Sequence, residues 1–333
     1  MTLGIFYLFL TVVLILEGKL TEPGIRLLLP TPTAEPVSGA GFIGIPFWFW
    51  IISVALVMFP HELSHGVIAR LEKVKVKSVG AFLLLIFPGA FVEPDERQFQ
   101  RAKLMSKLRI IGAGTFANFS TAIVLLLIAS FLIWPNFVEP GVVITNVNQT
   151  APAGEAGLAE GMVLQRLNGK EIKPEYTNFF GVYTTALLSN IKIDQIKDIT
   201  ALHPVGLELA KYKPGDTITL TADGRDMDIK LGNHPLNSNF PYIGVSSTLN
   251  SSADGGVFGV LLPLITLSLY ISLLVGIVNI LPIWPLDGGV FVRSVFDKFF
   301  KKKSGQLTSI VTFSMLLLIM TTIVLPIVLN LAP

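Results

Sequence analysis

Residues 59–66 read Phe-Pro-His-Glu-Leu-Ser-His-Gly and lie near the end of a long apolar stretch. Residues four apart share one face of a helix, so His61 and His65 can direct their imidazoles at a single metal ion. Glu62 lies about a quarter-turn away, where its carboxylate can reach a metal-bound water rather than the metal itself. Ionisable side chains at membrane depth cost on the order of 3 kcal/mol each, so they are rarely kept without a function. The pattern predicts a catalytic metal centre in preference to a helix cap or to histidines satisfied within a core.

Composition places the chain in the class of integral membrane proteins. Hydrophobic residues make up 51% of the sequence and charged residues 14%, whereas a soluble domain carries about 25% charged residues. The net charge of +2 is too small to indicate a nucleic-acid partner. The absence of cysteine excludes disulfides, cysteine nucleophiles and thiolate ligands, so zinc would have to be held by histidine and carboxylate. The first residues lack the basic start and cleavage site of a signal peptide, and we expect a retained segment.

Hydropathy predicts five transmembrane helices, of which the first is short for a span. They cover residues 3–16, 45–71, 110–134, 257–281 and 306–331. The four prolines within residues 17–44 predict a loop there. Residues 73–79 alternate between apolar and polar, as a strand does, and the apolar segment 81–92 is too short to cross a bilayer. Together they predict a β-hairpin that associates with the membrane.

The polar segment 139–250 predicts a soluble domain inserted between two membrane blocks, 1–138 and 251–333. It begins with a strand and a short helix, and two hairpins follow around the turns Asn168-Gly169 and Asp223-Gly224. This order resembles a PDZ domain, although the match is poor between residues 172 and 203. The expected fold is therefore an α-helical integral membrane protein with a membrane-associated β-hairpin and an inserted α+β PDZ-like domain. That domain could bind a peptide or a substrate segment, exclude substrates by size, or only pack.

The distribution of Lys and Arg predicts the orientation in the membrane. Basic residues are concentrated between the second and third predicted spans and between the fourth and fifth: Arg70, Lys73, Lys75, Lys77, Arg97, Arg101, Lys103, Lys107 and Arg109, then Arg293, Lys298 and Lys301 to Lys303. The loop after the first span has only Lys19 and Arg26. Both basic loops fall on one side of a five-span protein, which is then cytoplasmic. We expect a multi-pass cell-membrane protein with its metal centre near the cytoplasmic side and the PDZ-like domain outside.

A catalytic zinc usually has three protein ligands and one open position. The third histidine of the metzincin pattern is absent, because Leu71 occupies its position. After Glu139, the glutamates lie in the soluble domain, on the wrong side of the membrane. Asp287 stands in an apolar context after a span that runs from outside to inside, so it arrives at the depth of the histidine pair. It is the best candidate for the third ligand; the alternative is a helix cap or a turn before Gly288.

These motifs together resemble the site-2 protease family of intramembrane zinc metalloproteases. The resemblance rests on His-Glu-Leu-Ser-His at 61–65, Asn-x-x-Pro at 279–282 and Leu-Asp-Gly at 286–288, with further matches at 89–96 and 114–118. It implies that His61, His65 and Asp287 hold one Zn²⁺, and that Glu62 takes a proton from the attacking water. It also implies regulated intramembrane proteolysis of membrane-protein substrates in the lipid bilayer.

Several polar residues have roles that the sequence leaves open. Asn118 could hydrogen-bond the substrate backbone or the developing oxyanion, or it could join two helices. Asn279 has either a structural role or a role in contacting the substrate helix. Glu93 is expected at the surface or in a turn, and His203 and His234 are expected in solvated loops. The strand-like segment 74–92 could pair by its edge with an extended substrate.

Two other function classes use the same residues. A membrane metal transporter or sensor would need several polar spans along a path, and the other spans are nearly featureless. In a non-catalytic membrane scaffold, the PDZ-like domain would carry the function. The presence of Glu62, which is not a metal ligand in this pattern, argues against both classes.

Overall fold

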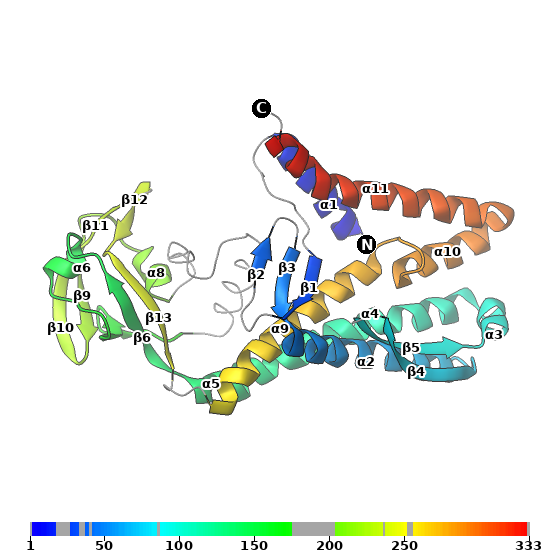
Figure 1. The fold of residues 1–333 in the computed structure, drawn as a ribbon, viewed down its shortest axis with the longest axis horizontal. Helices are drawn as coiled ribbons and strands as arrows, with labels where there is room; N and C mark the ends of the chain where they lie inside the picture. The colour runs from blue at the N-terminus through cyan, green and yellow to red at the C-terminus, as the bar shows by residue number, and fades with distance from the viewer. Residues whose placement is uncertain are drawn as a thin grey trace. The chain divides into compact units, whose positions relative to one another are not determined.

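The computed structural model describes residues 2–17, 27–32, 37–39, 42–84, 87–174, 204–235, 237–251 and 256–331. The chain forms two compact units. The first combines Met1–Leu126 with Leu264–Pro333, and the second is Leu127–Pro263 (Figure 1). The three-part division at residues 138 and 250 remains a prediction.

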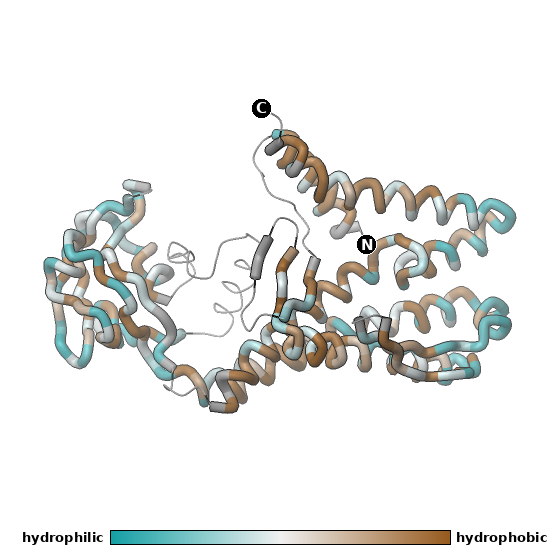
Figure 2. The backbone as a smooth tube through the Cα atoms, in the orientation of Figure 1, coloured by the Kyte–Doolittle hydropathy of each residue, from teal (hydrophilic) through white to brown (hydrophobic). Residues whose placement is uncertain are grey.

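Long apolar helices make up most of the first unit. The apolar helices are α1 (Thr2–Leu16), α2 (Phe47–Leu71), α4 (Leu104–Ile128), α9 (Gly256–Ile280) and α11 (Ser304–Leu331). The unit also contains the short polar helix α3 (Glu96–Arg101) and helix α10 (Asp287–Phe300). After α4 the chain continues into the second unit as η1 (Ala129–Ile133) and α5 (Trp134–Phe137). Four helical stretches in the described chain are long and apolar enough to cross a membrane: Phe47–Leu71, Leu104–Phe137, Val260–Ile280 and Asp287–Pro326 (Figure 2).

These stretches agree with a multi-pass membrane protein. Helix α1 is apolar but shorter than the length that a span usually requires. The number of five spans therefore remains a prediction. The last stretch contains two helices, because Lys301 adopts a positive φ of 35° and the 3₁₀ turn Lys301–Lys303 separates α10 from α11. Helix α10 was not expected from the sequence, which we interpreted there as a basic loop.

The prediction of a loop over residues 17–44 was wrong for residues 27–31, 37–39 and 42–44, where the structure has strands. Residues 18–26, 33–36 and 40–41 lie outside the described residues. Strands β1 (Leu27–Thr31), β2 (Val37–Gly39) and β3 (Phe42–Pro46) form a sheet in which β3 lies between the other two. The prolines argued against regular structure, but Pro30 lies in β1, an edge strand of this sheet, where a missing N–H is tolerated. Central strand β3 buries Ile43 and Ile45 and leads directly into α2.

The β-hairpin expected between the second and third helices is present. Strands β4 (Val76–Leu84) and β5 (Phe87–Pro94) pair in antiparallel register, and β5 packs against α2. The first strand begins at Val76 rather than at residue 73 because a Schellman motif ends α2: Lys73 has a φ of 62°, and the Val74 N–H bonds to the Ala69 carbonyl. Its association with a membrane stays a prediction.

Polar contacts join the helices that carry the candidate site. Ser268 of α9 donates to Ser53 of α2 at 3.0 Å, and Ser272 of α9 donates to the Asn118 carbonyl of α4 at 2.8 Å. Hydrogen bonds of this kind stabilise helix association where no hydrophobic effect operates between helices. Helix α9 is thereby fixed against both α2 and α4.

The second unit contains a six-stranded antiparallel sheet. The order is β10 (Arg225–Lys230), β9 (Thr217–Ala222), β7 (Val163–Leu167), β6 (Val138–Val147) and β13 (Val245–Ser251), with β8 (Lys170–Glu171) paired to β7. The short helices α6 (Pro152–Glu155) and α8 (Pro204–Leu209) and the pair β11 (Gly232–His234) and β12 (Asn237–Tyr242) complete the unit. Its core includes Val142, Leu164, Leu167 and Leu220.

Both tight turns predicted in this unit are confirmed. Asn168 and Gly169 have φ values of 48° and 75°, and Asp223 and Gly224 have values of 47° and 74°. Two consecutive positive φ angles define the type I′ turn that joins antiparallel strands. Most of the segment where the PDZ resemblance is poor lies outside the described residues, and the resemblance itself remains a prediction.

The turn between α9 and α10 is held from two sides. Leu281 and Ile283 pack in a cluster with Leu8 of α1 and Met315 of α11. The Trp284 N–H donates to the Thr312 hydroxyl at 3.0 Å. Helices α1 and α11, which lie side by side in Figure 1, thus fix the position where α10 begins.

A methyl group at Gly288 should destabilise this turn. A Cβ there would overlap the carbonyl oxygens of Ile280 and Leu281, which are backbone atoms and cannot move aside cheaply. We expect Gly288→Ala to lower the free energy of unfolding by about 1–3 kcal/mol, measured by thermal unfolding of the protein purified in detergent. Gly305→Ala, whose Cβ meets nothing within 4 Å, is the matched control. Equal midpoints for the two variants would contradict the expectation.

Candidate metal centre

Helix α2 carries the two histidines on one face. His61 and His65 are one turn apart, and their Nε2 atoms lie 3.2 Å from each other. His61 is almost completely buried, with 3% of its surface exposed. Gly114 of α4 lies against both rings, since a Cβ there would be 2.6 Å from His61 Nε2. Only glycine leaves the space in front of the two nitrogens open.

A hydrogen bond fixes the tautomer of His65. Its Nδ1 lies 2.7 Å from the Ile110 carbonyl oxygen, which can only accept, so Nδ1 carries the proton. In the neutral ring the Nε2 lone pair then faces His61. A backbone acceptor on the other ring nitrogen is the arrangement that metal-bound histidines commonly show. His61 Nδ1 is buried without a hydrogen-bond partner among the described residues.

Asp287 reaches the histidines from the first residue of α10. Its Oδ2 lies 3.5 Å from His61 Nε2, and its Oδ1 lies 3.4 Å from His65 Nε2. Oδ2 is buried and has no hydrogen-bond partner among the described residues. The three side chains form a group that could hold a metal ion.

The spacing of these atoms fits a zinc ion. Ligand atoms about 2.0–2.2 Å from one zinc ion at the tetrahedral angle lie about 3.3–3.6 Å apart. The two histidine Nε2 atoms are 3.2 Å apart, and the 3.5 and 3.4 Å distances to Asp287 are measured to its two different carboxylate oxygens. With one ligand atom taken from each residue, all three atoms lie within 4.8 Å of one another. Two imidazole nitrogens and a carboxylate are also donors that zinc commonly takes. A tetrahedral zinc held by these three residues would have one position open.

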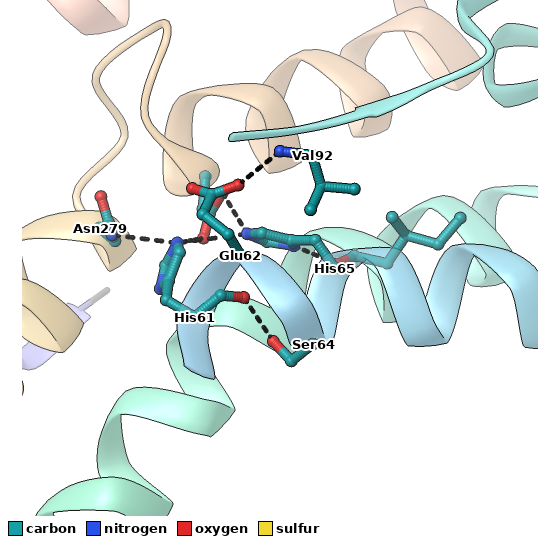
Figure 3. Close-up of polar contacts among 8 residues, drawn as sticks. His61, Glu62, Ser64, His65, Val92 and Asn279 are labelled. Atoms are coloured by element: carbon teal, nitrogen blue, oxygen red, sulfur yellow. Dashed lines mark hydrogen bonds and ion pairs between the residues drawn. The ribbon is translucent and has the colours of Figure 1, made fainter. Parts of the chain in front are cut away.

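Glu62 stands beside this group without belonging to it. Its Oε2 accepts a hydrogen bond of 3.1 Å from the backbone N–H of Val92 in β5 (Figure 3). The second oxygen of the carboxylate is left for other contacts. A carboxylate next to, but outside, the ligand group is the arrangement expected of a general base.

Two asparagines lie at the rim of the site. Asn118 of α4 is fully buried, and neither polar atom of its side chain has a hydrogen-bond partner among the described residues. Gly276 of α9 allows this close approach, because a Cβ there would lie 3.3 Å from the Asn118 Cβ. Asn279 of α9 places its Nδ2 3.5 Å from His61 Nε2 (Figure 3). Both amides are directed at the metal-site region from elements other than α2.

Other residues from the sequence analysis lie away from this group. Glu93 is half-exposed in β5, where Ser78 donates to it at 2.7 Å. His234 is not in a loop: it ends β11, and its ring packs edge-on against Tyr242. Strand β11 has three residues, too few for an alternating pattern to indicate a strand there. His203 lies outside the described residues.

Some contributions to the site were not predicted. The Val92 N–H and the Ile110 carbonyl are backbone groups, which every residue carries, so no side-chain pattern could indicate them. In the sequence, Gly114 stands out only as part of the match at residues 114–118. The motif Gly-x-x-x-Asn at 114–118 contained the usable signal.

The comparisons with known proteins place this site in the class of membrane metalloproteases. A model of peptidase family M50 matches residues 49–322, which include every candidate site residue. The chain therefore belongs to peptidase family M50, the site-2 protease family, and is a multi-pass membrane protein with a metal cofactor.

Individual relatives are distant in sequence but similar over long stretches. The chain is 28% identical over 300 residues to an uncharacterized protein of Methanocaldococcus jannaschii, covering 87% of this chain and 69% of that protein. It is 23% identical over 309 residues to the zinc metalloprotease RasP of Bacillus licheniformis, covering 82% and 72%. It is 26% identical over 250 residues to the probable protease eep of Enterococcus faecalis, covering 62% and 54%.

Filling the space at Gly114 should abolish metal binding. We expect Gly114→Ala to reduce the metal content of the purified protein at least tenfold, because its methyl group would overlap the imidazoles of His61 and His65. Gly112→Ala on the same helix is the matched control, since a Cβ there meets nothing within 4 Å. Metal content is measured by inductively coupled plasma mass spectrometry. Full metal occupancy in Gly114→Ala would show that the ion binds elsewhere.

Proposed function

We propose that this M50 protein is a zinc endopeptidase that cleaves transmembrane substrates within or near the bilayer. The observation that carries the proposal is the convergence of His61, His65 and Asp287, whose ligand atoms all lie within 4.8 Å of one another, beside a glutamate outside the group. These three residues would hold the ion. When bound, zinc would supply Lewis acidity, lowering the pKa of water to near 7 and polarising a carbonyl oxygen.

Glu62 is the proposed general base. It accepts the proton of the attacking water and then donates it to the amine that leaves when the peptide bond breaks. Its Oε2 is held by the Val92 N–H, so the other oxygen is the one available for proton transfer. The apolar helices around the site limit bulk water, which strengthens these electrostatic interactions.

Asn118 and Asn279 are the proposed contacts to substrate. The two polar atoms of the Asn118 side chain are buried without partners, so substrate groups can satisfy them. Burying an unsatisfied amide costs about 1–3 kcal/mol, which favours such a role over passive packing. The Asn118 amide would donate to the scissile carbonyl as negative charge develops on it. Asn279, whose Nδ2 lies 3.5 Å from His61 Nε2, would contact the substrate backbone nearby.

A substrate helix must unwind before its peptide bonds can be attacked, because its backbone groups are satisfied internally. We propose that the unwound segment pairs with an edge of the β4–β5 hairpin. The Val92 N–H leaves β5 on the side away from β4, so the alternate residue Ala90 also directs its N–H to that free edge. This edge adjoins α2 and thus the proposed base.

We further propose that the metal centre lies near the cytoplasmic side and that the second unit is extracytoplasmic. The basic residues between α2 and α4 and between α9 and α11 support this orientation. The sheet of the second unit and its two type I′ turns are compatible with a PDZ-like domain. Such a domain would bind a peptide or a substrate segment by strand addition.

Glu62→Gln tests the proposed chemistry. Glutamine keeps an oxygen that can accept the Val92 N–H, but it cannot take up a proton. We expect the zinc content to stay unchanged while cleavage of a transmembrane peptide in proteoliposomes falls about 10²–10⁴-fold. Zinc flux that is equal in the variant and the unmodified protein, with no cleavage in either, would favour a transporter instead.

Ala90→Pro tests the proposed substrate edge. Proline removes the outward N–H of Ala90 without removing a hydrogen bond to β4. Since one hydrogen bond contributes about 0.5–1.5 kcal/mol, we expect KM for a transmembrane peptide to rise about two- to tenfold, with the zinc content unchanged. Ala90→Ser keeps the N–H and is the control. An unaltered KM in Ala90→Pro would exclude pairing at this position.

A further inference from the structure

Strand β5 contacts α2 at Glu62 and again at Gly66, and the proposed chemistry does not use the contact at Gly66. We propose that β5 positions the general base: the backbone N–H of Val92 orients Glu62, and Gly66 is the residue that lets the strand approach closely enough. Gly66 and Val92 are thus positioning residues. The proposal rests on the role given to Glu62 in the proposed function.

One residue of β5 makes both contacts. The Val92 N–H donates to Glu62 Oε2 at 3.1 Å (Figure 3). The Val92 side chain lies over Gly66, where a Cβ would be 3.1 Å from Val92 Cγ1. Glu62 and Gly66 are four residues apart on α2, so they lie on one face of the helix. Val92 therefore contacts both Glu62 and Gly66 on the same face of α2.

The spacing explains why residue 66 is a glycine. A separation of 3.1 Å is shorter than an ordinary van der Waals contact between carbon atoms, which is about 3.5–4.0 Å. Gly66 is buried and helical, a position where alanine would be favoured by about 1 kcal/mol on propensity alone. Any side chain would push β5 outward by a few tenths of an ångström, and it would lengthen the hydrogen bond to Glu62.

The donor is not part of the hairpin ladder. Val92 is the register partner of Val79 in β4, but its N–H is directed at Glu62 instead. In an antiparallel pair, such a residue occupies a non-hydrogen-bonded position. The N–H can therefore be deleted without breaking a hydrogen bond between β4 and β5.

The functional consequence is that one strand, β5, would orient both the general base and the substrate. A carboxylate with one oxygen tethered loses freedom of rotation, so its second oxygen is held in one orientation. The same strand edge is the one proposed to pair with substrate. A substrate peptide paired with β5 would then lie at a fixed position relative to the Glu62 carboxylate, because the β5 backbone holds both the peptide and the carboxylate.

Replacing Val92 by proline tests the tether directly. Val92→Pro removes the N–H at a position where proline is tolerated, whereas Val92→Ala keeps the N–H and reports the cost of losing the side chain. We expect kcat of Val92→Pro to be at least tenfold below that of Val92→Ala, with equal KM and equal zinc content. Equal kcat values in the two variants would overturn the proposal.

A compensating pair tests the role of Gly66. Gly66→Ala should lower kcat several-fold, and adding Val92→Ala should recover most of that loss, because the shortened side chain makes room for the new methyl group. A merely structural defect at Gly66 would not be rescued by a second truncation. Absence of rescue, together with unchanged zinc content, would contradict the close-approach argument.

Hydrogen exchange supplies a readout that does not depend on activity. In Glu62→Ala the Val92 N–H loses its acceptor, so its exchange should accelerate at least tenfold, while the neighbouring Phe91 N–H, whose register partner is Gly80, should not change. Unchanged exchange at Val92 would overturn the proposal even if Val92→Pro does not fold. Failure of the proposed function looks different: the unmodified protein would then cleave no faster than Glu62→Gln.

Discussion

The candidate site of this protein depends on three side chains that direct their ligand atoms toward one another inside apolar surroundings. The two imidazole Nε2 atoms are 3.2 Å apart, and each lies 3.4–3.5 Å from one of the two Asp287 carboxylate oxygens. Lone pairs brought this close in a medium of low dielectric constant repel one another. A cation bound among them would turn the repulsion into attraction. The proposed metal would therefore stabilise the folded site together with the helices that present its candidate ligands.

The remaining architecture can be understood as the means of bringing these atoms together. Helix α2 supplies the histidine pair, while the start of α10 supplies Asp287. Serine hydroxyls fix α9 against α2 and α4, and the turn after α9 is packed between α1 and α11. Glycines stand wherever a methyl group would intrude, as at Gly114 between the imidazoles and at Gly288 in the turn. Small and polar residues bring these helices together because burying apolar surface does not drive association between helices that already lie in lipid.

The β4–β5 hairpin adds a second kind of constraint. An isolated two-stranded hairpin is marginally stable in water, so it needs a surface to pack on. Here that surface is α2, the helix that carries the candidate metal ligands His61 and His65 and also Glu62. A contact that stabilises the hairpin thus also restrains the carboxylate. Structural support and alignment of the reacting groups are provided by the same few atoms.

Much of this was readable from the sequence because it depends on side-chain identity and spacing. The membrane class follows from composition, and the histidine pair follows from the period of the helix. The two type I′ turns follow from Asn-Gly and Asp-Gly. Asp287 was found as a candidate because an acidic residue in an apolar stretch is costly.

Only the tertiary structure decided the contributions that carry no side-chain signature. The Ile110 carbonyl and the Val92 N–H are common to every peptide, and their roles follow from where α4 and β5 are placed against α2. The sheet around β3 was missed for a related reason, since prolines count against a strand unless the strand lies at an edge. Sequence specified which groups could do chemistry. Packing determined which of them meet, because contact between distant segments depends on the whole fold.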